Sequence, residues 1–143
     1  MKTAQEKLRI AQEYAISNRP HIGGFPFFAE CLRLAGVQKN IWSLPSAQSI
    51  YVMDEGAVVF QGTPLVTGSA DVLPFDKDAL VTALRHDQAG NSTFPEFLTA
   101  SWNAGIIQYI VDFFTRTVTY YGARGETYQE PYPAVEVSGL TFA

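Results

Sequence analysis

The chain repeats its pattern of prolines, glycines and aromatic residues at a spacing of 69 positions. The stretch FPFFAECLRLAGV begins at Phe25, and FPEFLTASWNAGI begins at Phe94. Further along, Tyr51 and Tyr120 are also 69 positions apart. Such residues set where helices begin and where turns occur, so two copies of one fold would keep them. We infer an internal duplication; the alternative is that any helix followed by a strand tends to carry this punctuation.

The first copy predicts two helices, a hairpin and a further strand. Leu8, Ala11 and Ala15 follow helical spacing, and Pro20 with the glycine pair after it breaks that helix. Pro26 favours the first turn of a second helix. The predicted helices cover residues 3–17 and 25–35, and the predicted strands cover residues 37–42, 48–53 and 56–62.

The second copy predicts the same order of elements. An apolar stripe resumes after Asp76, and Gly90 ends it. Thr93 and Glu96 then stand three apart, which is the spacing of a capping box. The following helix runs to residue 103 or 104, and strands are predicted at 106–113, 117–121 and 127–137.

These patterns predict an α+β fold. We expect a single domain over residues 1–143, built from copies at about 3–62 and 72–131 with an extension at 132–143. Short turns join the strands, so the sheet should be mostly antiparallel, with helices covering it in a pseudo-twofold arrangement. Apolar and polar residues alternate imperfectly in the extension, which predicts that it extends the sheet or pairs with another subunit. A homodimer is therefore a further prediction.

Composition and charge weigh against several classes of partner. Ten basic and fourteen acidic residues give a formal net charge of −4, and the basic ones form no run, so we expect no binding to nucleic acid or to an anionic membrane. No secretory leader follows Lys2, and no long apolar run is present. A lone cysteine fits a reducing compartment, so we expect a cytoplasmic protein.

Two long stretches of the chain resemble the YdfO-like family of bacterial proteins. They are GGFPFFAECLRLAGV in the first copy and AGIIQYIVDFFTRTVTYYGARGETYQEPYPAV in the second, and the resemblance covers nearly the whole chain. It implies a prophage or mobile-element origin and a function that is unknown. Some members carry the label phage envelope protein, although nothing in this sequence spans or coats a membrane. The resemblance implies no catalytic residues and no cofactor.

The segment ETYQEPY holds the most unusual group of candidate site residues. In an extended conformation Glu126, Tyr128 and Glu130 share one face, and a ladder of this kind suits a cation, a sugar or a basic peptide. The two glutamates would lie about 13 Å apart by their α-carbons, which is too far for a pair of hydrolytic carboxylates. The alternative is the solvated face of an edge strand, which Pro131 favours.

Two other places carry polar candidates. Tyr121, Arg124 and Glu126 surround the turn GARGE and form our preferred recognition surface. The alternative is that they are polar only because the tip of a hairpin is exposed to solvent. His21 precedes two glycines at a helix start, where an anion could bind; a structural turn is the alternative. His86 is expected near a helix end, as a partner of the helix dipole.

Neither a nucleophile with its base nor a metal site is predicted. Cys31 falls on a buried stripe and reads as a core residue. The two histidines and the single cysteine are far apart in the chain and fall short of a zinc set. We therefore expect a non-catalytic binding or interaction module without a cofactor, whose partner is a protein or a small ligand. The alternatives are a small enzyme or ligand-binding protein with a cleft between the copies, and a structural phage component.

Overall fold

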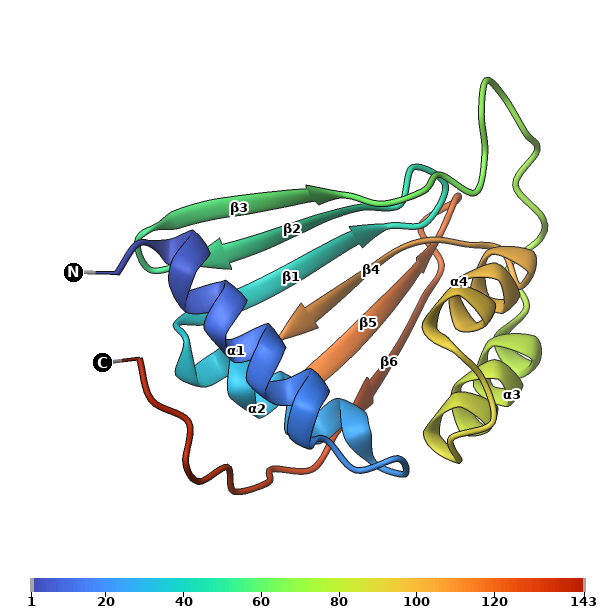
Figure 1. The fold of residues 1–143 in the computed structure, drawn as a ribbon. Helices are drawn as coiled ribbons and strands as arrows, with labels where there is room; N and C mark the ends of the chain where they lie inside the picture. The colour runs from blue at the N-terminus through green and yellow to red at the C-terminus, as the bar shows by residue number, and fades with distance from the viewer. Residues whose placement is uncertain (1, 143) are drawn as a thin grey trace.

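A computed structural model describes residues 2–142, in which four helices and a six-stranded antiparallel sheet confirm the α+β class (Figure 1). Every neighbouring pair of strands is antiparallel. The helices are α1 (Ala4–Asn18), α2 (Gly24–Leu34), α3 (Lys77–Gln88) and α4 (Phe94–Asn103). The strands are β1 (Val37–Ser43), β2 (Gln48–Met53), β3 (Gly56–Gln61), β4 (Ile106–Asp112), β5 (Thr117–Gly122) and β6 (Thr127–Pro131).

The sheet joins the two halves of the chain through its central strands. Its order is β3-β2-β1-β4-β5-β6, so each half supplies three consecutive strands. At the junction Ile41 pairs with Ile110, and Trp42 pairs with Tyr109. The two predicted copies therefore share one continuous sheet.

The two halves are alike in local geometry. The bounds of β1 and β4 differ by 69 positions at both ends, as do those of β2 and β5. Each first hairpin has a register shift near its start, after Val37 in one half and after Ile106 in the other. Ala47 and Arg116, which are also 69 positions apart, both have a positive φ, of 55° and 54°. This likeness fits an internal duplication, which stays a prediction.

Local capping explains where three of the helices begin. Thr3 caps α1 and Thr93 caps α4, and each forms a capping box with a glutamate three residues later, as predicted for Thr93. The side chain of Asp76 accepts a hydrogen bond from the N–H of Ala79 at the start of α3. Helix α2 instead begins after Gly23, which adopts a left-handed conformation with a φ of 73°.

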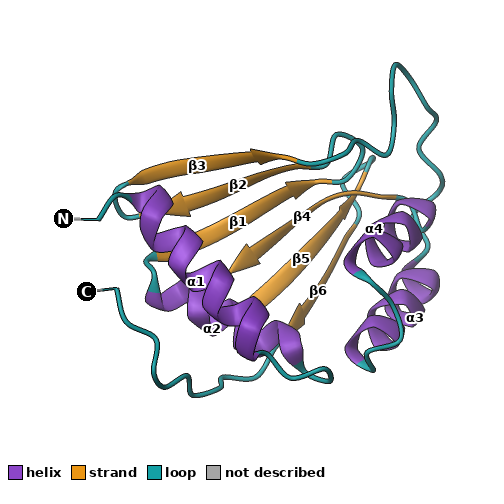
Figure 2. Ribbon diagram, in the orientation of Figure 1, coloured by secondary structure: helices purple, strands orange, loops and turns teal. Residues whose placement is uncertain are grey.

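Both helix pairs cover the same face of the sheet, here called the inner face (Figure 2). On β5, Val118 and Tyr120 are buried beneath the helices, whereas Thr119 and Tyr121 point to the opposite, outer face. One apolar cluster spans both halves. Its fully buried members include Leu8, Leu32, Leu44, Leu80, Ile106 and Phe113.

The C-terminal segment differs from the sequence-based expectation. The last strand ends at Pro131 rather than at residue 137, and residues 132–142 form no strand. The predicted extension of the sheet is wrong for these residues. The segment packs against the helical layer instead, where the hydroxyl of Tyr14 donates a hydrogen bond to the carbonyl of Ser138. Val137 and Leu140 add apolar contacts to the core. No helix within residues 2–142 is long and apolar enough to cross a membrane.

Candidate functional site

Glu130 on β6 is the centre of a polar cluster with α3. Its carboxylate accepts two hydrogen bonds from the Arg85 guanidinium, at 3.1 and 3.0 Å, and one from the Gln88 amide at 3.1 Å. The hydroxyl of Tyr128 donates another at 2.7 Å. The side chain of Glu130 is only 13% exposed, so the interpretation of this residue as part of a solvated face is wrong. Its acceptor sites are occupied by the protein itself.

The hydrogen bonds of this cluster fix the ionisation of Glu130. Burial alone would raise the pKa of Glu130, but the hydrogen bonds from Arg85 and Tyr128 outweigh it and leave the pKa below its ordinary value. The same bond to Glu130 raises the pKa of Tyr128. The cluster is therefore a charged pair with a neutral phenol, held together across the α3–β6 contact.

A row of aromatic rings crosses the inner face beside this cluster. Trp42, Tyr109, Tyr120 and Tyr128 lie directly opposite one another on β1, β4, β5 and β6. Their neighbouring ring centroids are 6.2, 5.6 and 6.4 Å apart. Phe94 of α4 packs edge-on against Trp42, at 5.1 Å between centroids. Aromatic rings thus occupy the boundary between the halves.

His21 lies in the loop before α2, and Asp87 lies in the last turn of α3. A methyl group on Gly90 would come within 2.6 Å of His21 Nε2, so the loop before α2 touches the loop after α3. Ser92 donates a hydrogen bond to Asp87 at 3.0 Å. Burial nevertheless raises the pKa of Asp87, whose surroundings include Arg19. His21 itself is exposed. The contact at Gly90 gives it a place between the halves that the sequence did not indicate.

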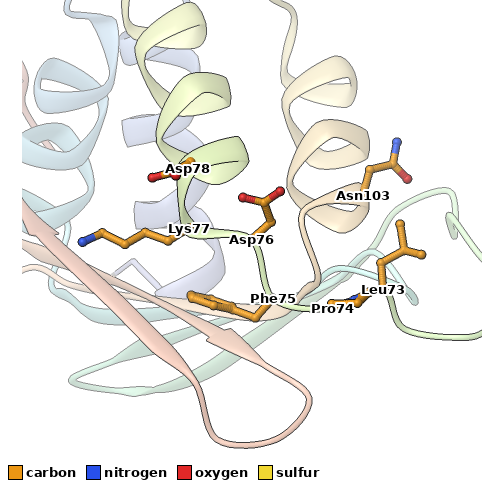
Figure 3. Close-up of a pocket in the computed structure, with 7 residues that line it drawn as sticks. All are labelled: Leu73, Pro74, Phe75, Asp76, Lys77, Asp78 and Asn103. Atoms are coloured by element: carbon orange, nitrogen blue, oxygen red, sulfur yellow. The ribbon is translucent and has the colours of Figure 1, made fainter.

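A second polar region lies along the connector, the segment of residues 62–76 that joins β3 of the first half to α3 of the second. Residues 73–78 form one wall of an open hollow of about 430 Å³, which is lined by Leu73, Pro74, Phe75, Asp76, Lys77, Asp78 and Asn103 (Figure 3). A smaller hollow of about 180 Å³ adjoins it and shares three of these residues. Val72, Ala123, Arg124 and Glu126 complete its lining. We call the two hollows together the connector groove.

The walls of the connector groove are held by close backbone contacts. The N–H of Asp76 donates to the carbonyl of Ala104 at 2.8 Å. Gly105 has a φ of +84°, and a Cβ atom there would lie 2.5 Å from the carbonyl oxygen of Pro74. Phe75 lies against Gly122, where a Cβ atom would come within 3.0 Å of its ring. These glycines let the connector approach α4 and β5 closely.

The connector groove combines exposed apolar and charged groups. Val72 is 39% exposed and Leu73 is 48% exposed. None of the ion pairs seen among residues 2–142 includes Arg124 or Asp78. At one end, Lys77 points away from the other lining residues (Figure 3), and its amine lies 5.5 Å from the Tyr128 ring centroid. This groove offers free charges of both signs beside apolar surface.

The structure divides the site residues that the sequence singled out. Arg124 and Glu126 meet at the connector groove, where Glu126 accepts a hydrogen bond from the Arg124 N–H at 2.9 Å. Tyr128 and Glu130 meet in the cluster below α3. Tyr121 lies on the outer face and pairs across the strands with Gln108 and Thr127, so it joins neither group. A single cleft lined by all of these residues is not formed.

The interpretations of Cys31 and His86 agree with the structure. Cys31 is fully buried, and burial raises the pKa of its thiol to about 11. His86 is exposed in the last turn of α3. Among residues 2–142, no three His, Cys, Asp or Glu side chains gather as they would around a metal ion.

Sequence reasoning missed the residues that complete both regions. Arg85 and Gln88 reach Glu130 across 45 and 42 positions of the chain, and no local pattern connects them. Leu73 and Phe75 lie in a segment that contains two prolines and no predicted helix or strand. Apolar residues in a segment with prolines and no predicted helix or strand were the one sequence signal for the connector groove.

Comparison with known proteins places the chain in a family but assigns it no function. Residues 13–130 match the model of a family described as protein of unknown function DUF1398. The chain belongs to this family. The match covers both halves of the sheet and includes every strand except the last residue of β6.

The chain is also similar to uncharacterised proteins of two mycobacteria. One is from Mycobacterium bovis and another from Mycobacterium tuberculosis; each is 54% identical over 132 residues. The alignment covers 92% of this chain and 80% of each relative. These relatives bring no activity, ligand or partner with them.

Proposed function

We propose that the protein is a non-catalytic binding module that holds a short peptide segment of a protein partner in the connector groove. The observation that carries this proposal is the free surface of the groove, where exposed Leu73 lies beside the unpaired charge of Arg124. A peptide with an apolar side chain between charged ones would satisfy both. An open groove suits an extended segment better than a small molecule, which usually needs an enclosing pocket.

The state of the other polar groups supports binding rather than catalysis. Arg85, Gln88 and Tyr128 already occupy the carboxylate of Glu130, so this cluster has no free group for a substrate. Cys31 is buried and its raised pKa keeps it a thiol, which disfavours a nucleophilic role. A general base paired with a nucleophile has no support among these residues.

The proposal extends to the origin and location of the protein. The YdfO-like resemblance supports a role in a prophage or another mobile element, and the lone cysteine supports a cytoplasmic location. The gene neighbourhood of close relatives tests the first, because a mobile element would place phage genes beside it. Fractionation of the host cell tests the second.

Selection from a library of random peptides tests the binding function directly. The immobilised protein should enrich peptides that carry an apolar residue flanked by charges. Arg124→Ala and Leu73→Ala should each weaken the selected peptides about tenfold, which corresponds to about 1.4 kcal/mol. Arg9→Ala and Ile16→Ala are matched controls, because Arg9 and Ile16 are exposed on α1. They should leave binding unchanged.

Two results would reject this function. One is a library from which the folded protein enriches no peptide. The other is a set of peptides that bind the groove variants as tightly as the unaltered protein. A metabolite that raises the melting temperature of the protein, without any peptide binding, would favour a small-ligand function instead.

A further inference from the structure

The two edges of the sheet are protected to very different degrees. At one edge, β6 contains Pro131, which lacks a backbone donor, and Glu130, whose charge is held by α3. At the other edge, β3 has the sequence GAVVFQ, with no charge and no proline. Natural sheets usually carry such features where an edge must stay unpaired. The β3 edge has none of them.

The backbone of β3 has unused hydrogen-bonding groups on its free side. The Gly62 N–H donates to the Ala47 carbonyl at 2.8 Å, which sets the alternation of hydrogen-bonded pairs along the β2–β3 hairpin. By that alternation the N–H and C=O groups of Ala57, Val59 and Gln61 point away from β2. Within residues 2–142 no backbone hydrogen bond is seen on that side. Figure 1 shows no further element beyond this edge.

The side chains of β3 are also unusually open. Val59 is 55% exposed and Phe60 is 40% exposed, although both are large apolar residues. Val59 ends a row of directly paired apolar residues on the outer face, which continues through Ile50 and Ile41 to Ile110. This row reaches the edge of the sheet and stops there without a covering group.

We propose that β3 pairs antiparallel with β3 of a second copy of this chain and so joins the two sheets into one. The pairing places Val59 opposite Val59 of the second copy and Ala57 opposite Gln61 of the second copy, with the free N–H and C=O groups facing each other. Val58 and Phe60 then meet across the interface on the inner face, and the apolar row of the outer face continues into the second copy.

A second copy fits this edge better than a flexible peptide does. The strand carries no charge, so no like charges oppose each other when it meets itself in a twofold arrangement. Its partner is already an ordered strand, whereas a disordered peptide would lose conformational freedom on binding. The interface lies on the opposite edge of the sheet from β6 and is separate from the connector groove.

Light scattering after size-exclusion chromatography measures the predicted dimer. The unaltered protein should show twice the mass of one chain, and the dimer should dissociate on dilution. Val59→Lys should give a monomer, because two like charges would face each other at the twofold axis. Val59→Glu should do the same. An equimolar mixture of these two variants should form a dimer again, because the charges are then opposite.

Gln129→Lys is the matched control, because Gln129 lies on β6 in the same cross-strand row as Val59. It should leave the dimer intact. Circular dichroism establishes that each variant is folded, and hydrogen exchange on the unaltered protein gives an independent measure: the amides of Ala57 and Val59 should exchange more slowly at high protein concentration. A monomeric parent protein, a dimer that survives Val59→Lys, or a dimer lost in Gln129→Lys would each overturn the proposal.

Discussion

Ile41 of β1 lies directly opposite Ile110 of β4, its counterpart 69 positions later in the chain. On either side of this pair, Trp42 lies opposite Tyr109 and Asn40 lies opposite Val111. Tyr109 is the counterpart of Asn40 at the 69-position spacing, and Val111 is the counterpart of Trp42. This pattern is that of a twofold axis that passes between the two strands. An axis perpendicular to the sheet brings both helix pairs to one face, and within residues 2–142 no helix covers the other face.

Gly105 should be one of the least replaceable residues of the chain. In Gly105→Ala the new Cβ would lie 2.5 Å from the Pro74 carbonyl oxygen, in a residue whose φ is +84°. We expect the free energy of unfolding to fall by about 3 kcal/mol or more. Gly125→Ala is the control, because Gly125 has nearly the same φ and nothing within 4 Å of its Cβ position. It should cost about 1–2 kcal/mol. Urea unfolding that gives equal costs would contradict the close approach of the connector.

The Arg85–Glu130 pair should contribute measurably to stability. Arg85→Ala and Glu130→Gln should each lower the free energy of unfolding by about 1–2 kcal/mol, because each removes hydrogen bonds between Arg85 and the largely buried Glu130 side chain. A double-mutant cycle should give a coupling of about 1 kcal/mol. The pair formed by Arg9 and Glu13 is more than half exposed on both sides and should couple by only about 0.3–0.5 kcal/mol. Equal coupling in the two cycles would argue against a special role for the cluster.

Glu130 also predicts how stability depends on pH. Its pKa is lower in the folded protein than the ordinary value of 4.5, so the unfolded chain takes up a proton first as the pH falls. The contribution of Glu130 is therefore present above pH 4.5 and is lost as the pH falls through the folded pKa. Glu130→Gln should lose this part of the acid sensitivity. Urea midpoints of the two proteins that differ by a constant amount from neutral to acid pH would contradict this assignment.

Asp87 should affect the pH dependence of stability in the opposite direction to Glu130. Burial raises its folded pKa above the ordinary value of 3.8, so its charged form costs stability once the pH exceeds that value. Asp87→Asn removes the charge and keeps an oxygen that can accept the hydrogen bond from Ser92. The variant should be more stable than the parent at neutral pH, and the difference should vanish in acid. Thermal unfolding followed over a pH series measures both effects.

Cys31 should be inert while the protein is folded. Its thiol is fully buried, and its pKa of about 11 leaves little thiolate at neutral pH. A thiol reagent such as iodoacetamide should label the unfolded chain readily and the native protein only at the rate of unfolding. Rapid labelling of the native protein at neutral pH, read by mass spectrometry, would show that α2 opens more easily than its burial indicates.

The elements of the fold were predictable because their signals are local. The spacing of Thr93 and Glu96 identified the start of α4, and Pro20 with its following glycines identified the end of α1. The strand that ends at Pro131 was predicted too long, since Tyr132 and the residues after it alternate like a strand. Contacts with the helices override that alternation.

The polar regions were less predictable because distant segments build them. Glu130 looked solvated from its own strand, and only the position of α3 places Arg85 above it. The connector groove depends on how closely the chain passes Gly105 on its way into α3. Tyr120 and Tyr121 face opposite sides of β5, as their strand pattern predicts, but that pattern does not show which residues of other segments lie near Tyr121.

The central pairing of Ile41 with Ile110 has a consequence for synthesis and folding. Every other strand pair closes a short hairpin, which costs little loop-closure entropy, whereas this junction must close a loop that holds about half of the chain. We expect its formation to limit the folding rate. On the ribosome the first half emerges alone, and the free side of β1 stays exposed until β4 has been made. A chain cut short before β4 should therefore depend on chaperones and aggregate without them.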